Sequence, residues 1–219
     1  MCLLRPIDKT DAMIWGIDMD KPAAERKTLC FKLVRKYRAN REYPGRYYSY
    51  IQMVHCTPGI TYHDRHQQDL RFATLDAYDF NGKKVVDNYY QSGFHCYLDL
   101  KAAVILLVGH ELDRLDDDRH ADWQFVLMLV ELRDITCVGE QDNTVVAVGR
   151  TQHVICELGG LPEGARSMKW DENPLNSLTL EFAKTVSKYK SGELTYETSA
   201  GDTDGSDQHT ADSARVPPN

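Results

Sequence analysis

The sequence predicts an α+β fold in which a curved, mostly antiparallel sheet surrounds one buried helix, with a C-terminal amphipathic helix and a disordered tail. Three observations carry this prediction. Residues 28–37 alternate apolar and polar side chains, which is typical of a strand with one buried face. Residues 123–132 are almost continuously apolar, which indicates a central strand covered on both faces. Residues 100–115 have helical length and follow Asp99, whose carboxylate can accept hydrogen bonds from the first amides of a helix.

Turn residues delimit the strands of the first half of the chain. Pro44-Gly45 predicts a turn, and the tyrosine- and isoleucine-rich residues 46–54 predict a second strand after it. A short strand at 60–63 follows Thr57-Pro58-Gly59. Asn81-Gly82 predicts a type I′ turn within a hairpin over residues 77–87, because both residues tolerate positive φ angles.

The second half of the chain begins with a glycine turn at Ser92-Gly93 and the short strand Phe94–Tyr97. The helix at 100–115 is apolar on nearly every face as far as Val108, so we expect it to be enclosed by the fold. Residues 134–139 and 144–157 are expected to continue the sheet, joined by a turn at residues 140–143. Apolar residues at helical spacing predict the C-terminal helix over 175–190: Leu175, Leu178, Phe182, Val186 and Tyr189.

Composition divides the chain into an N-terminal arm (1–27), one α+β domain (28–190) and a disordered acidic tail (191–219). The tail carries six acids and one arginine, so it holds −5 of the formal net charge of −7. A nearly neutral body argues against nucleic acid as a partner. No apolar run has the length of a membrane span, and Arg5 and Asp8 interrupt the first apolar residues, so we expect a soluble, cytoplasmic protein without a membrane partner.

The six cysteines form no Cys-x-x-Cys pair. Four of them stand in apolar, strand-like surroundings: Cys30, Cys96, Cys137 and Cys156. This pattern favours buried free thiols in a reducing compartment over a disulfide framework.

His95 is the first candidate for chemistry. Successive strand residues point to opposite faces, so His95 faces a groove if Phe94 and Cys96 face the core. A histidine there can act as a general acid or base or bind a ligand, because its pKa lies near neutrality. The alternative is a structural histidine that satisfies backbone groups. Cys96 and His95 point apart, so a nucleophile–base pair is not favoured, although His153 on another strand could pair with either.

Two further groups have both a structural and a functional interpretation. Glu131 ends an apolar strand two residues before Arg133, which predicts an ion pair or, alternatively, a catalytic carboxylate within reach of His95. His63 and His66 could share one helical face, but no third ligand is fixed, so we predict no metal site.

A basic stretch, residues 35–46, interleaves arginine and lysine with tyrosine. It is either a solvated loop over packed tyrosines or a surface that faces phosphate or a nucleotide. For the second case, the predicted ligand-binding residues are Lys32, Arg35, Tyr48, Gly93 and Phe94.

The order of motifs resembles a small uncharacterised family with a Gly-Phe-His strand–helix motif, found in open reading frames of bacteriophages and other viruses. The resemblance covers residues 28–158 and implies no activity. The matching features are Cys30-x-Lys32, a tyrosine-rich second strand, Gly59-x-x-Tyr62, Gly93-Phe94-His95-Cys96-Tyr97 with Ala102 and Ala103, Val130-Glu131, and residues 145–158.

The segment Gly93–Tyr97 is also more distantly similar to the strand that walls the NAD pocket in ADP-ribosyltransferase-like folds. That resemblance implies NAD as cofactor and His95, Tyr97 and Glu131 as catalytic residues. His95 replaces the tyrosine of that pattern, and Lys32 and Arg35 are the only substitutes for its first-strand signature.

Three functions therefore remain open. The first is a viral or phage-type accessory protein without a cofactor that binds a nucleotide-like small molecule or a host protein. The second is an ADP-ribosyltransferase-like enzyme. The third is a pure protein-interaction module that uses residues 35–48 or the acidic tail.

Overall fold

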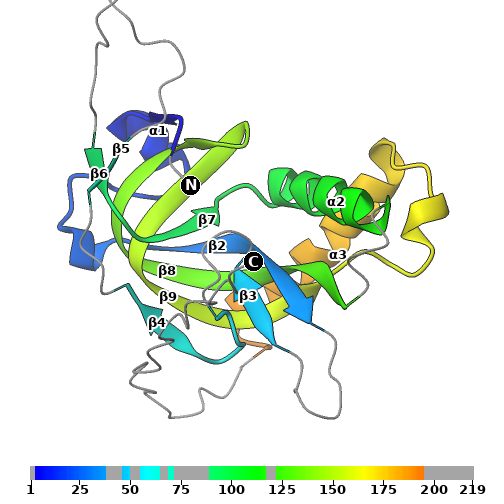
Figure 1. Cartoon of the computed structure of the whole chain (residues 1–219). Coiled ribbons are helices and arrows are strands. Elements are labelled where there is room, and N and C mark those ends of the chain that lie inside the picture. The colour runs from blue at the N-terminus through cyan, green and yellow to red at the C-terminus, as the bar shows by residue number, and fades with distance from the viewer. Residues whose placement is uncertain are drawn as a thin grey trace, which may run out of the picture.

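The computed structural model describes residues 3–37, 46–49, 55–64, 69–71, 89–116 and 122–194. The described part of the chain consists of short N-terminal elements, strands and two long helices (Figure 1). In chain order they are β1 (Arg5–Pro6), α1 (Lys9–Ile14), the 3₁₀ turn η1 (Ala23–Glu25), β2 (Lys27–Tyr37), β3 (Tyr47–Ser49), β4 (Thr61–His63), β5 (Asp69–Arg71), β6 (Tyr89–Gln91), β7 (Phe94–Tyr97), α2 (Leu100–Asp116), β8 (Trp123–Gln141), β9 (Thr144–Gly159), the 3₁₀ turn η3 (Ala165–Ser167) and α3 (Glu172–Lys190).

The sheet curls until it closes on itself. β8 and β9 form one long, strongly bent antiparallel hairpin (Figure 1). β2 pairs with the first half of β8, and β7 pairs with the first part of β9. Phe31 of β2 is also the register partner of Tyr97 of β7, so the ring β8–β2–β7–β9 is complete. The expected curved, mostly antiparallel α+β architecture is confirmed.

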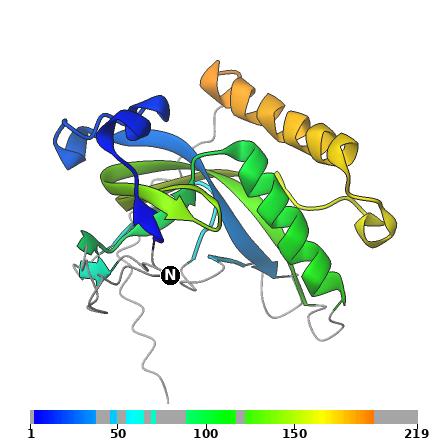
Figure 2. The ribbon, with the colours of Figure 1, turned by 90° about the horizontal axis from the view of Figure 1, so that it is seen from above.

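Two apolar cores lie on opposite faces of this sheet. Side chains such as Val34, Met128 and Val130 fill the core on the side of α1, whereas Phe31, Leu127 and Leu129 meet α2 and α3 on the other side. Figure 2 shows both long helices on one side of the sheet. Residues 123–132 are therefore almost continuously apolar because both faces of β8 are covered.

The first turn of α2 is capped as predicted, since the Ala102 amide donates to Asp99 Oδ1 at 3.0 Å. Its burial differs from the expectation of an enclosed helix. Ala103, Val104 and Leu107 are fully buried, but Ile105 is 49% exposed on the other side. The sheet covers one side of the helix and α3 only part of the rest, so one apolar residue is left facing solvent.

The described part of the predicted arm packs with the rest of the chain. Ala12 and Ile17 reach the core on the α1 side, and Leu3 reaches the opposite core. β1 extends the sheet by pairing Arg5 with Glu140 of β8. Residues 3–26 are thus a structural part of the domain that we expected to begin at residue 28.

Most predicted elements are present with small changes of length. β2, β7, β8, β9 and α3 occupy the expected positions, and the turn between β8 and β9 narrows to Asp142 and Asn143, both with positive φ. Only 47–49 of the predicted strand at 46–54 is described as β3, and the turn at 40–45, the hairpin at 77–87 and the tail beyond 194 lie outside the described residues.

The described cysteines are buried free thiols, as expected: Cys30, Cys56, Cys96, Cys137 and Cys156. None of the helices in the described part of the chain has the length and apolarity needed to cross a membrane.

Candidate ligand-binding cleft

His95 lies at the centre of a chain of hydrogen bonds. As predicted from strand alternation, Phe94 and Cys96 point into the core on the α1 side, and His95 points to the opposite face. His95 Nδ1 lies 2.8 Å from Gln141 Oε1, and its Nε2 lies 3.4 Å from the Tyr90 hydroxyl. Because an amide oxygen can only accept a hydrogen bond, His95 Nδ1 carries the proton and donates a hydrogen bond to Gln141 Oε1. Nε2 is then the acceptor.

The environment of His95 keeps its imidazole neutral. Burial lowers the pKa of His95 to about 4, against a partly opposing hydrogen bond to Gln141. The chain continues as Gln141 Nε2 donates to Asp142 Oδ2 at 3.0 Å, and the Tyr97 hydroxyl donates to the same oxygen at 3.0 Å. His95 and Tyr97 therefore belong to one network, in which His95 is uncharged at neutral pH.

The third predicted catalytic residue, Glu131, is not brought to this network. Its carboxylate accepts from Arg133 at 2.5 Å, which confirms the expected ion pair. Along β9, the register partner of Glu131 is His153 and that of His95 is Val148. Five strand residues separate these positions, or about 16 Å. The set His95, Tyr97 and Glu131 is thus not assembled as one catalytic site.

The predicted ligand-binding residues fall into two groups on opposite faces of β2. Lys32 is only 4% exposed, with Nζ 3.0 Å from Gln152 Oε1 and 5.2 Å from the centre of the Phe94 ring. Gly93 is pressed against β9, where a Cβ atom would lie 2.5 Å from the Gly149 carbonyl oxygen. Lys32, Gly93 and Phe94 are thus part of the packed interior.

Arg35 and Tyr48 are register partners on the other face. The Arg35 guanidinium lies 4.7 Å from the centre of the Trp123 ring, and Tyr48 packs edge-on against Tyr37. Both residues therefore belong to an aromatic and cationic cluster on this face of β2. Arg38, Arg41 and Tyr43 of the basic stretch lie outside the described residues.

Two other histidines in the described part of the chain, His153 and His63, each lie beside a threonine hydroxyl. His153 Nδ1 lies 3.0 Å from Thr61 Oγ1, and His63 Nδ1 lies 3.2 Å from Thr151 Oγ1. His66 lies outside the described residues. Within the described ranges, no group of three histidine, cysteine or acidic side chains is arranged to hold a metal ion.

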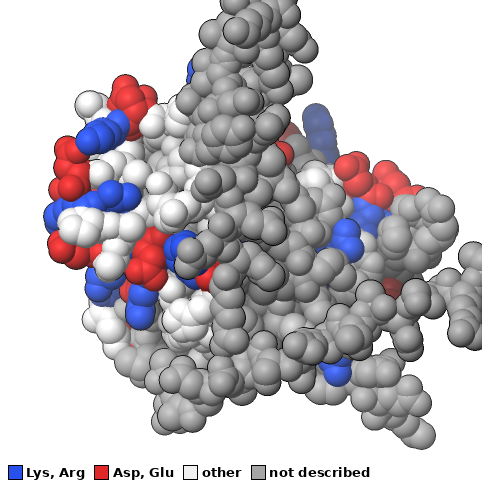
Figure 3. Space-filling view, turned by 60° about the vertical axis from the view of Figure 1, so that its left-hand side comes forward, with Lys and Arg blue, Asp and Glu red and all other residues white. Residues whose placement is uncertain are grey.

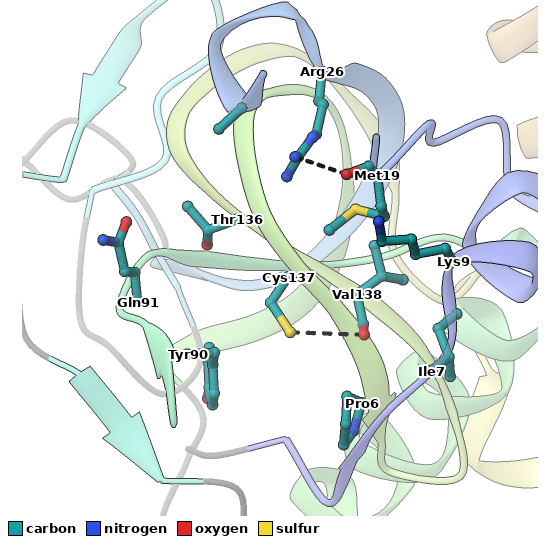
Figure 4. A pocket seen from close by; sticks show the side chains of 11 residues that line it. Pro6, Ile7, Lys9, Met19, Arg26, Tyr90, Gln91, Thr136, Cys137 and Val138 are labelled. Carbon is teal, nitrogen blue, oxygen red and sulfur yellow. Dashed lines mark hydrogen bonds between the residues drawn. The ribbon is translucent and has the colours of Figure 1, made fainter. Parts of the chain in front are cut away.

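A cleft of about 610 Å³ opens beside the His95 network, between residues 6–26, β6 and the second half of β8. We call it the N-terminal cleft (Figure 4). Tyr90 connects the two sites, because it lines the cleft and its hydroxyl reaches His95. The apolar part of the lining is Pro6, Ile7, Met19, Ala23, Cys137 and Val138, and the polar part is Lys9, Arg26, Tyr90, Gln91 and Thr136.

The floor of the cleft is an irregular part of β8. The β8–β9 register shifts between Ile135 and Cys137, so Thr136 is the extra residue of a bulge. Asp134, two residues earlier, has a φ of 54°, which is rare for a residue other than glycine. Bulges and unusual backbone angles are found frequently near binding and active sites, where they redirect side chains.

Arg26 holds the N-terminal segment against this floor. Its Nε donates to the Lys21 carbonyl at 2.7 Å, Nη1 to the Ile135 carbonyl at 2.8 Å and Nη2 to the Met19 carbonyl at 2.9 Å. At the other end of the cleft, the Ile7 amide donates to the Val138 carbonyl at 3.1 Å. Main-chain contacts therefore fix the N-terminal segment at both ends of the cleft, so the cleft is preformed.

Cys137 is not a reactive thiol of this cleft. Burial raises its pKa to about 12, and its Sγ lies 3.7 Å from the Val138 carbonyl oxygen. A protonated, buried thiol is a weak nucleophile, so Cys137 contributes apolar surface.

A second cavity of about 440 Å³ lies between η3 and the start of α3. Its lining includes Met168, Trp170, Leu178 and Glu181. Neither this cavity nor the N-terminal cleft is lined by Gly93 or Phe94. The strand that would wall an NAD pocket in the distant resemblance therefore lines neither cavity.

Sequence reasoning missed the N-terminal cleft because it treated residues 1–27 as an appended arm. A usable signal was present: Ala12 and Ile17 are apolar, and the short stretch that follows them ends in a cation, Arg26. The partner of that cation, the Ile135 carbonyl, lies 109 residues away and cannot be deduced from local patterns.

Comparison with known proteins gives no relative: no family model, no curated protein and no solved structure matches the chain. The functional argument therefore rests on the geometry described above.

Proposed function

We propose that the protein is a binding protein that takes a small molecule into the N-terminal cleft. The observation that carries the proposal is the cleft itself, about 610 Å³ of preformed space with an apolar majority and a few polar groups. Small-molecule sites generally have volumes of about 300–1,000 Å³ and this mixture of lining groups. The bulge at Thr136 adds a feature that is common near binding sites, and Tyr90 connects the cleft to His95.

Binding is favoured over the enzyme alternative because the candidate catalytic residues are dispersed. Glu131 is engaged by Arg133, far along the sheet from His95. Both ring nitrogens of His95 face protein groups, so the imidazole serves the network that positions Tyr90. A role as an accessory protein that binds a small ligand fits this geometry, and a host-protein partner would need another surface.

A pair of variants at adjacent alanines tests the proposal. Ala23 lines the cleft, whereas its exposed neighbour Ala24 does not. We expect Ala23→Trp to fill the cleft and Ala24→Trp to leave it open. The full chain would be screened by thermal shift against a fragment library. A ligand at a hundred times its dissociation constant adds about 2.7 kcal/mol to stability and should be visible.

The proposal holds if fragments stabilise the wild type and Ala24→Trp but not Ala23→Trp. It fails if Ala23→Trp, folded by circular dichroism, responds to every fragment as the wild type does, or if no fragment binds.

A further inference from the structure

The charged side chains that line the N-terminal cleft are all cationic. Lys9 and Arg26 line it, and none of its eleven lining residues is acidic. Lys9 is paired with Asp20, and both side chains are largely exposed. Figure 3 shows described cationic and anionic side chains interspersed on one face of the molecule, so the described surface there has no extended field of one sign. The cleft is therefore a local exception, and its cation is Arg26.

Arg26 is a fixed cation without a carboxylate partner among the described residues. Its three hydrogen bonds all go to main-chain carbonyls, which orient the guanidinium but do not neutralise its charge. A guanidinium has five N–H groups in a rigid plane. Three are used, so one N–H remains on Nη1 and one on Nη2. Figure 4 shows the Arg26 side chain directed toward Met19 in the cleft.

We propose that the N-terminal cleft selects small organic carboxylates, whose carboxylate pairs end-on with Arg26 while the apolar body packs against Ile7, Met19 and Val138. This inference rests on the proposed function and adds the chemical class of the ligand. Arginine and carboxylate are well matched, because two parallel N–H groups meet two oxygens in one plane.

The charge balance favours a monoanion over a phosphate. Arg26 supplies one positive charge, and the charge of Lys9 is offset by Asp20. A phosphate monoester carries close to two negative charges at neutral pH and prefers several donors or a helix N-terminus. The α-helix beside the cleft, α1, has a first-turn amide capped by Asp8, since the Asp11 amide donates to Asp8 Oδ1 at 2.8 Å. A carboxylate is therefore the better match.

Pre-orientation of Arg26 gives the site its affinity. An exposed arginine loses side-chain freedom when it binds an anion, which offsets much of the gain. The three carbonyl contacts have already fixed Arg26, so a ligand carboxylate meets a guanidinium that needs no reordering. Partial burial of Arg26 also reduces screening of the new ion pair by solvent.

The experiment compares two probes of nearly the same shape, the anion 3-phenylpropionate and the neutral 3-phenylpropionamide, by calorimetry on the full chain. Hydrogen bonds to charged groups are the stronger class, so we expect the acid to bind about 10- to 100-fold more tightly than the amide. Salt should reduce this ratio, because it weakens the acid alone. Arg26→Gln should bring the ratio to about one. Lys27→Gln removes an exposed charge that does not line the cleft and should keep the wild-type ratio.

The outcomes separate this inference from the proposed function. Equal affinity of acid and amide for the wild type, with both lost in Ala23→Trp, overturns carboxylate selection and leaves the binding function intact. Absence of binding by both probes and by every library fragment overturns the proposed function, and the inference with it. If Arg26→Gln fails to fold, the acid-to-amide ratio of the wild type still decides.

Discussion

The neutral state of His95 predicts that the protein loses stability in mild acid through one identifiable group. Protonating His95 requires Nε2 to become a second donor, opposite a Tyr90 hydroxyl that would have to turn and accept. The imidazolium would also be desolvated by the surrounding apolar side chains. Substituting His95 by glutamine removes the titration and retains an amide that can donate to Gln141.

The magnitude follows from the difference between the folded and unfolded pKa values. The folded pKa of His95 is about 4 and the reference value is 6.5. The unfolded chain therefore binds a proton between these values while the folded chain does not, so stability is fully present above pH 6.5 and falls as pH decreases toward 4. Linkage gives a loss of about 2 kcal/mol at pH 5 and roughly 3 kcal/mol at the acid limit.

The assay is urea unfolding of the wild type and of His95→Gln between pH 8 and about pH 4.5, within the range of this shift. The carboxylates titrate in both proteins, so the difference between the two curves isolates His95. His153→Gln serves as a comparison for the size of the pH effect, because partial burial also lowers the pKa of His153. Parallel curves for the wild type and His95→Gln would refute the assignment of a buried neutral imidazole.

Three other substitutions test the packing that positions the cleft and the network. Gly93→Ala should destabilise the protein by several kcal/mol or prevent folding, because its Cβ would meet a β9 carbonyl at 2.5 Å. By contrast, Gly109→Ala lies on an open face of α2 and should raise the free energy of unfolding by about 1 kcal/mol. Asp99→Ala removes the cap of α2 and should cost about 1 kcal/mol, with the exposed Asp113→Ala as control. Glu111→Ala should cost about 3 kcal/mol, since it removes a buried carboxylate that accepts from a buried arginine and from a β8 amide. Urea unfolding at pH 7 measures all five, and equal values for the two glycine variants would contradict the close approach at residue 93.

Local patterns predicted the elements whose causes are local. The alternation over residues 28–37 and the continuous apolar run at 123–132 correspond to β2 and β8, because side-chain periodicity reports how many faces of a strand are covered. Asp99 predicted the start of α2, because a cap is satisfied within three residues. Even the direction of His95 followed from alternation along a four-residue strand.

The site could not be predicted because its causes are long-range. Nothing near Glu131 in sequence shows that five residues of β9 separate its register position from that of His95. The helix at 100–115 was expected to be enclosed because apolar residues occupy nearly every face as far as Val108, yet the curvature of the sheet decides how far each face is covered. The role of Arg26 depends on its contact with the Ile135 carbonyl, which lies next to the bulge in β8.

Two hydrogen bonds of the Tyr90 hydroxyl, with Leu3 and with His95, link the stability of the fold to the chemistry of the N-terminal cleft. Tyr90 is held from one side by the Leu3 amide at 3.1 Å and from the other by His95, so one wall of the cleft depends on a neutral imidazole. Arg26 lines another part of the same cleft. A carboxylate ligand loses its own charge near the pH at which His95 gains one. Affinity for the acid probe should therefore fall in mild acid more steeply in the wild type than in His95→Gln, because only the wild type loses both the ligand charge and the position of Tyr90.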